Sequence, residues 1–217
     1  MIEINKYIDH TILKATATED DIIELCKEAK KYSFFSVCVN SGYVSLAKEQ
    51  LTGSEVKICT VVGFPLGAMS TEAKIFETEQ AIRDGAEEVD MVINVGELRS
   101  KNFKKVEEEI AAIKKVVGER ILKVILETCY LTPQEIILAS ELAVKAKADY
   151  VKTSTGFGID GARMENIELM KKAVEGKAKL KASGGVKNLD MALSFIEAGV
   201  ERIGTSSGVS IVKELKK

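Results

Sequence analysis

The sequence predicts a (β/α)8 barrel formed by a single domain that spans residues 1–217. Short apolar runs alternate with longer amphipathic runs along the whole chain, and strands joined by helices in this way lie parallel, linked by right-handed crossovers. The predicted strands begin roughly every 20–35 residues, which is the size of one βα unit. No linker, low-complexity tract or block of like charges divides the chain, so we expect all eight units to share one barrel.

A doubly wound open sheet is the alternative for the same alternation of strands and helices. That fold normally has a Gly-x-Gly-x-x-Gly sequence directly after its first strand, where the backbone approaches a bound pyrophosphate. Residues 9–14 read Asp-His-Thr-Ile-Leu-Lys and contain no glycine. The closed barrel is therefore preferred.

Eight segments have the length and composition of strands: residues 7–11, 35–40, 57–62, 88–94, 122–127, 150–154, 180–183 and 202–204. Side chains along a strand alternate between its two faces. In several of these segments one parity is apolar and the other polar, as where Val89 and Met91 alternate with Asp90. Because the apolar parity matches a surrounding ring of helices, we expect the polar parity to point into the barrel.

The segments between the strands have helix start and stop signals. Thr18 and Asp21 form a capping-box pattern, and residues 132–135 (Thr-Pro-Gln-Glu) combine a hydroxyl N-cap, a proline at N1 and a glutamate at N3. Apolar residues recur at helical spacing over residues 103–117, and Gly118 is the expected stop. Three more helices are expected to end at glycines: Gly85, Gly176 and Gly199.

Composition and charge argue against several classes of partner. The 217 residues carry 31 Lys and Arg against 33 Asp and Glu, a formal net charge of −2, and this balance indicates neither a nucleic-acid nor a membrane-surface partner. No apolar run reaches the roughly 18–20 residues of a transmembrane helix, and the N-terminal residues have no apolar signal core. We therefore expect a cytoplasmic protein that does not bind membranes.

Cysteine and histidine usage argues against metal chemistry. The four cysteines are widely spaced, lack a Cys-x-x-Cys pair, and are expected to be reduced. His10 is the only histidine, so a zinc site built from several imidazoles is impossible. Its parity places it on the helix-facing side of its strand, where we expect a structural role. Neither a metal nor an organic cofactor is expected.

The polar parity of the strands concentrates charged groups inside the predicted barrel. The inward-facing charged residues are Asp9, Asp90, Lys123, Lys152 and Lys181. An inert network of ion pairs is one interpretation, but burying five charges for structure alone is costly. Perturbed ionisable groups cluster where chemistry is done, and we therefore interpret this set as catalytic.

A lysine of this set can act as a nucleophile. Desolvation and a second nearby cation both lower the pKa of a lysine and free its amine to form a Schiff base with a carbonyl substrate. Lys152 and Lys181 lie on neighbouring predicted strands at matching depth, so each could do this for the other. Asp90 would transfer the protons that follow. The spacing does not decide which lysine is the nucleophile.

Glycine and hydroxyl residues follow the seventh and eighth predicted strands, at residues 183–186 (Ser-Gly-Gly-Val) and 204–208 (Gly-Thr-Ser-Ser-Gly). Loops at these two places in (β/α)8 barrels frequently build a phosphate site from backbone N–H groups and a helix N-terminus. Glycines let the backbone approach phosphate closely, while Ser206 and Ser207 add hydroxyl donors. The sequence therefore predicts a phosphorylated ligand.

Motifs along nearly the whole chain resemble those of the deoxyribose-phosphate aldolases, a family of class I aldolases. The motifs are residues 7–11 (YIDHT), 63–67 (GFPLG), 89–92 (VDMV), 122–127 (LKVILE), 151–157 (VKTSTGF), 181–186 (KASGGV) and 204–207 (GTSS). The two lysine-containing motifs of the sixth and seventh strands are specific in combination, whereas the glycine loops alone are not.

This resemblance implies reversible, metal-independent cleavage of 2-deoxy-D-ribose 5-phosphate to D-glyceraldehyde 3-phosphate and acetaldehyde, in deoxyribose phosphate catabolism. It implies that Lys152 is the Schiff-base lysine and that Asp90 and Lys181 form the proton relay. The implied substrate-binding residues are Asp9 and Cys38 in the pocket, and Thr155, Gly156, Gly184, Gly185, Gly204, Ser206 and Ser207 around the phosphate. Members of the family are commonly dimeric, so a homodimer or higher homo-oligomer is expected.

The chain also differs from some members of that family, which end in a flexible tail whose terminal tyrosine assists proton transfer. The last residues here, 213–217, read Lys-Glu-Leu-Lys-Lys. Three other functions stay open on the residues: another Schiff-base aldolase of phosphorylated sugars, a phosphate-binding isomerase in which the lysines act as electrostatic stabilisers, and a sugar-phosphate-binding barrel without catalytic activity. A covalent adduct between an aldehyde and Lys152 would separate them.

Overall fold

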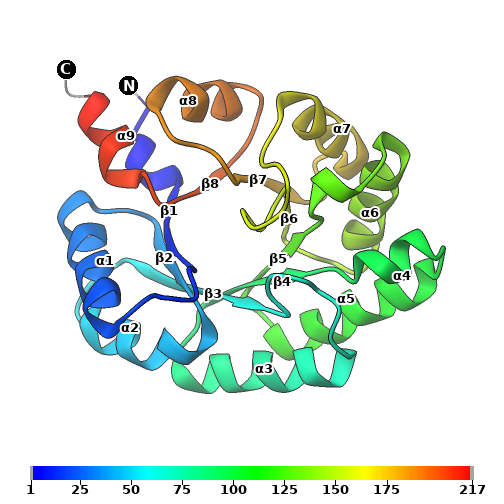
Figure 1. The fold of residues 1–217 in the computed structure, drawn as a ribbon, viewed down its shortest axis with the longest axis horizontal. Helices are drawn as coiled ribbons and strands as arrows, with labels where there is room; N and C mark the ends of the chain where they lie inside the picture. The colour runs from blue at the N-terminus through cyan, green and yellow to red at the C-terminus, as the bar shows by residue number, and fades with distance from the viewer. Residues whose placement is uncertain (1, 216–217) are drawn as a thin grey trace.

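The computed structural model describes residues 2–215 and has the predicted (β/α)8 architecture. Eight parallel strands form a closed barrel in the order of the sequence, with β1 paired to both β2 and β8. Figure 1 shows this barrel with the helices arranged as a ring around it. Lys216 and Lys217, part of the C-terminal sequence that lacks a tyrosine, lie outside the described residues.

The predicted strands agree with the observed ones to within two residues at each end. The strands are β1 (Ile8–Ile12), β2 (Ser36–Val39), β3 (Lys57–Val62), β4 (Glu88–Val92), β5 (Ile121–Ile125), β6 (Tyr150–Lys152), β7 (Lys179–Ser183) and β8 (Arg202–Thr205). The α-helices are α1 (Glu19–Tyr32), α2 (Val44–Gln50), α3 (Thr71–Asp84), α4 (Val95–Arg99), α5 (Phe103–Val117), α6 (Pro133–Lys145), α7 (Met164–Val174), α8 (Leu189–Glu197) and α9 (Gly208–Glu214). Short 3₁₀ helices are η1 (Ile4–Tyr7), η2 (Ser41–Tyr43) and η3 (Thr128–Tyr130). Within residues 2–215, no helix is both long and apolar enough to cross a membrane.

Three predicted strands extend two residues beyond the observed β4, β5 and β6. After β5, Glu127 has a left-handed backbone (φ 55°) that cannot continue a strand. After β6, the backbone N–H of Thr153 still donates to the carbonyl of Lys181 at 3.1 Å, so contact with β7 persists for one more residue. These strand ends lie on the carboxyl side of the barrel, where (β/α)8 enzymes carry their active sites.

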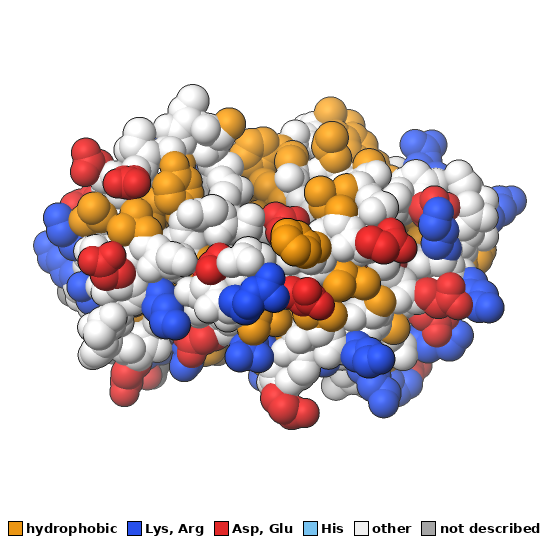
Figure 2. Space-filling view, turned by 90° about the horizontal axis from the view of Figure 1, so that it is seen from below, with side chains coloured by type: hydrophobic (Ala, Val, Ile, Leu, Met, Phe, Trp, Pro, Cys, Tyr) orange, Lys and Arg blue, Asp and Glu red, His pale blue; other side chains and the backbone are white. Residues whose placement is uncertain are grey.

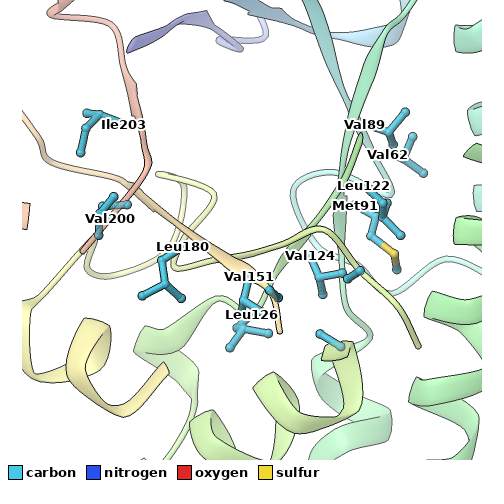
Figure 3. Packing of buried hydrophobic residues seen from close by; sticks show 14 of the residues in the cluster. Val62, Val89, Met91, Leu122, Val124, Leu126, Val151, Leu180, Val200 and Ile203 are labelled. Atoms are coloured by element: carbon cyan, nitrogen blue, oxygen red, sulfur yellow. The ribbon is translucent and has the colours of Figure 1, made fainter. Parts of the chain in front are cut away.

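The two faces of the strands divide as the alternation predicted. Apolar residues such as Val89, Met91, Leu122 and Val124 are 0% exposed and belong to the core between the strands and the helices. Figure 3 shows these side chains projecting from the strands, with helices beyond them. Burying each such side chain contributes about 1.5–3 kcal/mol, so this layer supplies much of the driving force for closing the barrel. The opposite parity is left to point inside.

The predicted helix signals lie at helix ends. Thr18 is the N-cap of α1 and Thr132 is the N-cap of α6, each with a complete capping box. Gly85 and Gly118 are the C-cap residues of α3 and α5. Two predicted glycines lie one residue past the C-cap of α7 or α8: Gly176 and Gly199.

The outer surface mixes charges of both signs. Figure 2 shows one side of the ring of helices, on which basic and acidic side chains are interspersed with hydrophobic ones. Some of these charges form pairs within a helix, such as Arg83 with Glu79 and Lys104 with Glu108. Exposed pairs of this kind contribute at most about 1 kcal/mol to stability.

Candidate active site

The five charged residues expected inside the barrel meet there in one buried ion-pair network, and each is at most 3% exposed. Asp90 lies at its centre. Asp90 Oδ2 accepts hydrogen bonds from Lys152 Nζ and Lys181 Nζ, each at 2.7 Å. Asp90 Oδ1 accepts from Lys123 Nζ at 2.8 Å. Asp9 completes the set by accepting from Lys181.

The parallel register explains why these residues meet. Lys152 on β6 is paired with Lys181 on β7, and Asp90 on β4 is paired with Lys123 on β5. Paired residues on neighbouring strands point to the same face, and closure of the barrel turns all inward positions toward one axis. Charges from distant parts of the sequence therefore converge without any local motif that joins them.

Two further charged residues belong to this network and were not selected from the sequence. Arg202 on β8 donates through Nε to Asp9 Oδ1 at 2.8 Å and pairs with Glu88 on β4. Its guanidinium carbon lies 3.5 Å from the ring centroid of Phe35. Arg202 is the register partner of Lys181, so the alternation of the last strand could have identified it.

Asp90 is held in its ionised form. Burial alone would raise the pKa of a carboxyl group, but the ammonium groups of Lys123, Lys152 and Lys181 outweigh this effect and hold the pKa of Asp90 well below its usual range. The resting network therefore holds Asp90 as a carboxylate placed between two lysines.

The expectation of a lowered pKa is wrong for Lys181. Burial lowers the pKa of its ammonium group, but direct contacts with Asp9 and Asp90 reverse this effect and raise the pKa of Lys181 above its usual range. The sequence argument considered the neighbouring lysine and omitted the two carboxylates that contact Lys181 directly. Lys181 is thus a firmly held cation.

The network contains one more cation than carboxylates. The cations are Lys123, Lys152, Lys181 and Arg202, and the carboxylates are Asp9, Glu88 and Asp90. Within the described part of the chain, Lys152 has one carboxylate partner, whereas each other cation of the network has at least two. Removing a proton from Lys152 therefore breaks the fewest ion pairs.

A cavity of about 400 Å³ opens at the carboxyl ends of the strands. Of the seven network residues, Lys152 is the one that lines it. The residues expected around a phosphate line the same cavity: Thr155, Gly156, Gly184, Gly185, Gly204, Ser206 and Ser207. The lysine amine and the glycine loops thus face one shared space.

Asp9 and Cys38, which were expected in the pocket, lie deeper than its lining residues. Both are 0% exposed, and neither borders the cavity. Asp9 contacts Lys181, so it belongs to the support beneath the site. Cys38 on β2 is the register partner of Cys59 on β3, whose Sγ lies 3.1 Å from Asp90 Oδ1.

Glycines in the loops after β7 and β8 leave no room for a side chain. Gly184 and Gly185 have left-handed backbones (φ 85° and 78°). A Cβ at Gly184 would lie 2.9 Å from the Cα of Gly161, and a Cβ at Gly204 would lie 2.9 Å from the Cβ of Ser183. These close approaches leave backbone groups, rather than side chains, to form this wall of the cavity.

Two groups of side chains offer atoms that a metal ion could bind. Within residues 2–215, one group is Cys38, Cys59 and Asp90, and the other is Asp9, Cys59 and Glu88. In each group the candidate ligand atoms lie within 4.8 Å of one another. Lys123 Nζ lies 2.6 Å from Glu88 Oε2 and 2.8 Å from Asp90 Oδ1. The ammonium group of Lys123 already supplies the positive charge that these carboxylates require.

His10 lies on the helix-facing side of β1, as its parity indicated. Its Nε2 lies 2.7 Å from Glu28 Oε2 on α1, and its ring centroid lies 4.9 Å from that of Phe34. Burial lowers the pKa of the imidazole. His10 therefore ties β1 to α1 and stands outside the interior network.

Comparison with known proteins agrees with this geometry. A family model described as "DeoC/LacD family aldolase" matches residues 4–214. The deoxyribose-phosphate aldolase of Finegoldia magna is 55% identical over 98% of this chain and 100% of the relative, and that of Brevibacillus brevis is 55% identical over 99% and 97%. Among solved structures, an aldolase called QR15 has a TM-score of 0.95 and 42% identity over 100% of this chain and 97% of its own. The tetrameric deoxyribose phosphate aldolase from Aeropyrum pernix has a TM-score of 0.92 and 31% identity over 99% and 91%. The chain therefore belongs to the DeoC/LacD family of aldolases.

Proposed function

We propose that this chain is a deoxyribose-phosphate aldolase that reversibly cleaves 2-deoxy-D-ribose 5-phosphate to D-glyceraldehyde 3-phosphate and acetaldehyde. The observation that carries the proposal is that Lys152 alone, of the seven network residues, borders the cavity formed by the glycine loops. An amine and a phosphate site in one cavity fit a phosphorylated aldehyde. The printed names of relatives that match nearly the whole chain support the same substrate.

In this proposal Lys152 attacks the aldehyde carbon of the open-chain sugar, and loss of water produces a protonated imine. The imine withdraws electrons, so the carbon–carbon bond beyond the neighbouring carbon breaks as the hydroxyl of the departing half loses its proton. D-Glyceraldehyde 3-phosphate leaves, and the enamine that stays on Lys152 takes up a proton on carbon. Water then releases acetaldehyde and restores the amine. No step requires a metal ion or an organic cofactor.

Asp90 and Lys181 are proposed to move the protons in these steps. Asp90 Oδ2 is 2.7 Å from both lysine Nζ atoms, so one carboxylate oxygen joins Lys152 to Lys181. An ionised Asp90 can accept the proton that Lys152 must lose before it attacks. Asp9 contacts Lys181 from the other side and orients its ammonium group.

The phosphate is proposed to bind against the loops after β7 and β8. Gly184, Gly185 and Gly204 would contribute backbone N–H groups, and Ser206 and Ser207 would contribute hydroxyls. Thr155 and Gly156 border the same cavity from the loop after β6. Placing the phosphate there directs the aldehyde end of an extended sugar toward Lys152.

Reductive trapping tests the assignment of Lys152. Borohydride added together with acetaldehyde should leave an ethyl group on Lys152, identified by peptide mass spectrometry. Lys152→Ala should show no such adduct, and Lys179→Ala, which changes an exposed lysine on β7, should behave as wild type. Failure to form an adduct anywhere would refute the Schiff-base aldolase, while an adduct at Lys181 would reverse the assignment of roles.

Three further expectations belong to this proposal. A homo-oligomer is expected, since the related enzyme from Aeropyrum pernix is described as tetrameric, and light scattering of the purified protein would measure it. A single domain over residues 1–217 and a cytoplasmic location stay predictions from the sequence, to be checked by limited proteolysis and by cell fractionation.

A further inference from the structure

A buried carboxylate beside the cavity takes no part in the reaction steps proposed above. Glu127 lies two residues after the end of β5 and is 3% exposed. Its backbone is left-handed, with φ 55° and ψ 64°, which is uncommon for a residue that has a side chain. Strain of this kind persists where surrounding contacts hold it, and it clusters near functional sites.

The side chain of Glu127 binds the loop that follows β6. One carboxylate oxygen accepts from the backbone N–H of Thr155 at 3.2 Å, and the other accepts from the Thr155 hydroxyl. Thr155 Oγ1 in turn accepts from the backbone N–H of Phe157 at 3.0 Å. A Cβ at Gly158 would lie 3.2 Å from Glu127 Cδ, so the loop packs directly against the carboxyl group.

This contact reaches a part of the loop that makes few other hydrogen bonds, although Phe157 also packs edge-on against Phe64, with ring centroids 5.3 Å apart. The connection from β6 to α7 is fixed near its ends by β7, because Thr153 donates to the carbonyl of Ser183 and Ala162 donates to that of Gly184, each at 3.0 Å. Between residues 155 and 158, the hydrogen bonds to other segments of the described chain all go to Glu127. Glu127, which lies just after β5, therefore accepts the hydrogen bonds that tie the middle of the loop to the rest of the barrel.

That middle section borders the catalytic cavity, whereas Glu127 does not. Thr155, Gly156 and Phe157 line the cavity beside Lys152. Glu127 instead lines a separate pocket of about 230 Å³ on the other side of the loop, together with apolar residues such as Val92 and Tyr130. The carboxyl group lies behind the loop and contacts the lining of the substrate space through Thr155, and the charge of Lys152 also acts on it.

We propose that Glu127 is a positioning residue that fixes residues 155–157 in the conformation that binds the phosphorylated sugar. It acts as a hydrogen-bond acceptor for Thr155 and exchanges no proton with the substrate. The inference rests on the proposed function, since the substrate that the loop contacts is the one that Lys152 attacks.

Substitution of Glu127 should separate binding from chemistry. Glu127→Ala should raise the KM for 2-deoxy-D-ribose 5-phosphate by about tenfold or more, since hydrogen bonds to a charged group are lost and the loop can leave its binding conformation. The turnover number kcat should fall much less, because Lys152 lies within β6, which pairs with β5 and β7 on its two sides. Glu127→Gln keeps an oxygen acceptor and should recover most of the lost KM. If kcat of Glu127→Gln fell as far as expected for the loss of a proton-transfer residue, the proposal would be overturned.

Asp149 provides a matched control. Its Oδ2 accepts from the backbone N–H of Leu122 at 2.8 Å and so joins the β5 and β6 segments at the opposite end of the barrel from Glu127. Asp149→Ala should lower the melting temperature and leave KM unchanged. A rise in KM equal to that of Glu127→Ala would mean that general loosening of these strands, rather than loop positioning, explains the effect.

A double-mutant cycle tests whether Glu127 acts through Thr155. Glu127→Ala should raise KM far less in a Thr155→Val background than in the wild type, and additive effects would overturn the proposed route. Hydrogen exchange measured without substrate supplies a readout independent of catalysis: amides of residues 155–158 should exchange faster in Glu127→Ala. Unchanged exchange there would refute the positioning role. A wild-type protein inactive on the sugar phosphate would refute the proposed function and leave the exchange result standing.

Discussion

At the scale of single residues, the interior of the barrel is organised around the carboxylate of Asp90. Three ammonium groups contact its two oxygens at 2.7–2.8 Å. The lysines differ in what else they touch: Lys123 and Lys181 each have a second carboxylate, whereas Lys152 borders the cavity. Their different roles therefore follow from their partners, although all three are the same residue type on similar strands.

Removing the amine of Lys152 should abolish turnover without unfolding the chain. Lys152→Ala leaves Asp90 paired with Lys123 and Lys181, so the buried carboxylate stays compensated. We expect kcat to fall to background while urea unfolding stays cooperative. Lys179→Ala on the exposed start of β7 should change neither. Loss of a cooperative transition in Lys152→Ala would show that the lysine is structural.

The network should also shape how stability depends on pH. The pKa of Asp90 is depressed in the folded state, so its stabilising contribution is complete above its unfolded pKa of about 3.9 and is lost as pH falls through the lower folded value. The pKa of Lys181 is raised, so its contribution is complete below about pH 10.4 and is lost as pH rises through the higher folded value.

Unfolding measurements at a series of pH values test the direction in which the contribution of Asp90 to stability changes with pH. The difference in unfolding free energy between wild type and Asp90→Asn should stay constant between about pH 5 and 9 and shrink below about pH 4. Asp20→Asn, at an exposed position of α1, supplies the surface control for the same series. A difference that grows on acidification would contradict the assignment of Asp90 as a buried anion.

At the scale of elements, the proposed catalytic residues lie on strands and the proposed phosphate wall lies on loops. Lys152, Asp90 and Lys181 are strand residues whose neighbours on both sides fix their depth. The proposed phosphate wall would come from the connections after β7 and β8, whose glycines allow close backbone approach. The strands should therefore govern kcat, and the loops should govern the preference for phosphorylated substrates.

A pair of glycine substitutions separates local strain from loss of the binding wall. Gly184 and Gly53 both have positive φ, so alanine at either costs about 1–2 kcal/mol in backbone strain. A Cβ at Gly53 meets nothing within 4 Å, whereas one at Gly184 would meet Gly161 at 2.9 Å. Gly184→Ala should raise the KM for deoxyribose 5-phosphate far more than that for free deoxyribose, and Gly53→Ala should change neither KM. Equal effects of Gly184→Ala on both sugars would argue against a phosphate site there.

At the scale of the whole molecule, the network joins strands from across the barrel. Arg202 on β8 pairs with Asp9 on β1 and Glu88 on β4, and Lys123 on β5 reaches Glu88 and Asp90. The pair between Arg202 and Asp9 joins β8 to β1, which are the last and first strands of the barrel. This ion pair therefore bridges the point at which the barrel closes.

Removing Arg202 should weaken the whole fold. Arg202→Met leaves Asp9 and Glu88 with less positive charge around them in a buried site, and breaking buried pairs in this way costs about 3–5 kcal/mol. Arg202→Met combined with Glu88→Gln removes one charge of each sign and should recover part of that loss. Denaturant unfolding of the three proteins would measure this, and a double variant less stable than the single one would contradict the charge-balance explanation.

The sequence by itself determined the fold class, the strand positions to within two residues and five of the seven inward charges. These follow from alternation along each strand, which is a local property that hydrophobic burial converts into two distinct faces. It also indicated two glycine loops, because they directly follow strands. The same parity argument also places Arg202 inside the barrel, although Arg202 was not among the predicted residues.

Only the tertiary structure decided depth, partners and pKa. The raised pKa of Lys181 depends on Asp9, which lies 172 positions away in the sequence, and the burial of Asp9 and Cys38 beneath the cavity depends on how eight strands close. Glu127 reaches Thr155 because its own backbone turns left-handed. Electrostatic energies depend on distances between groups and on their exclusion from water, and both quantities exist only once distant segments have packed together.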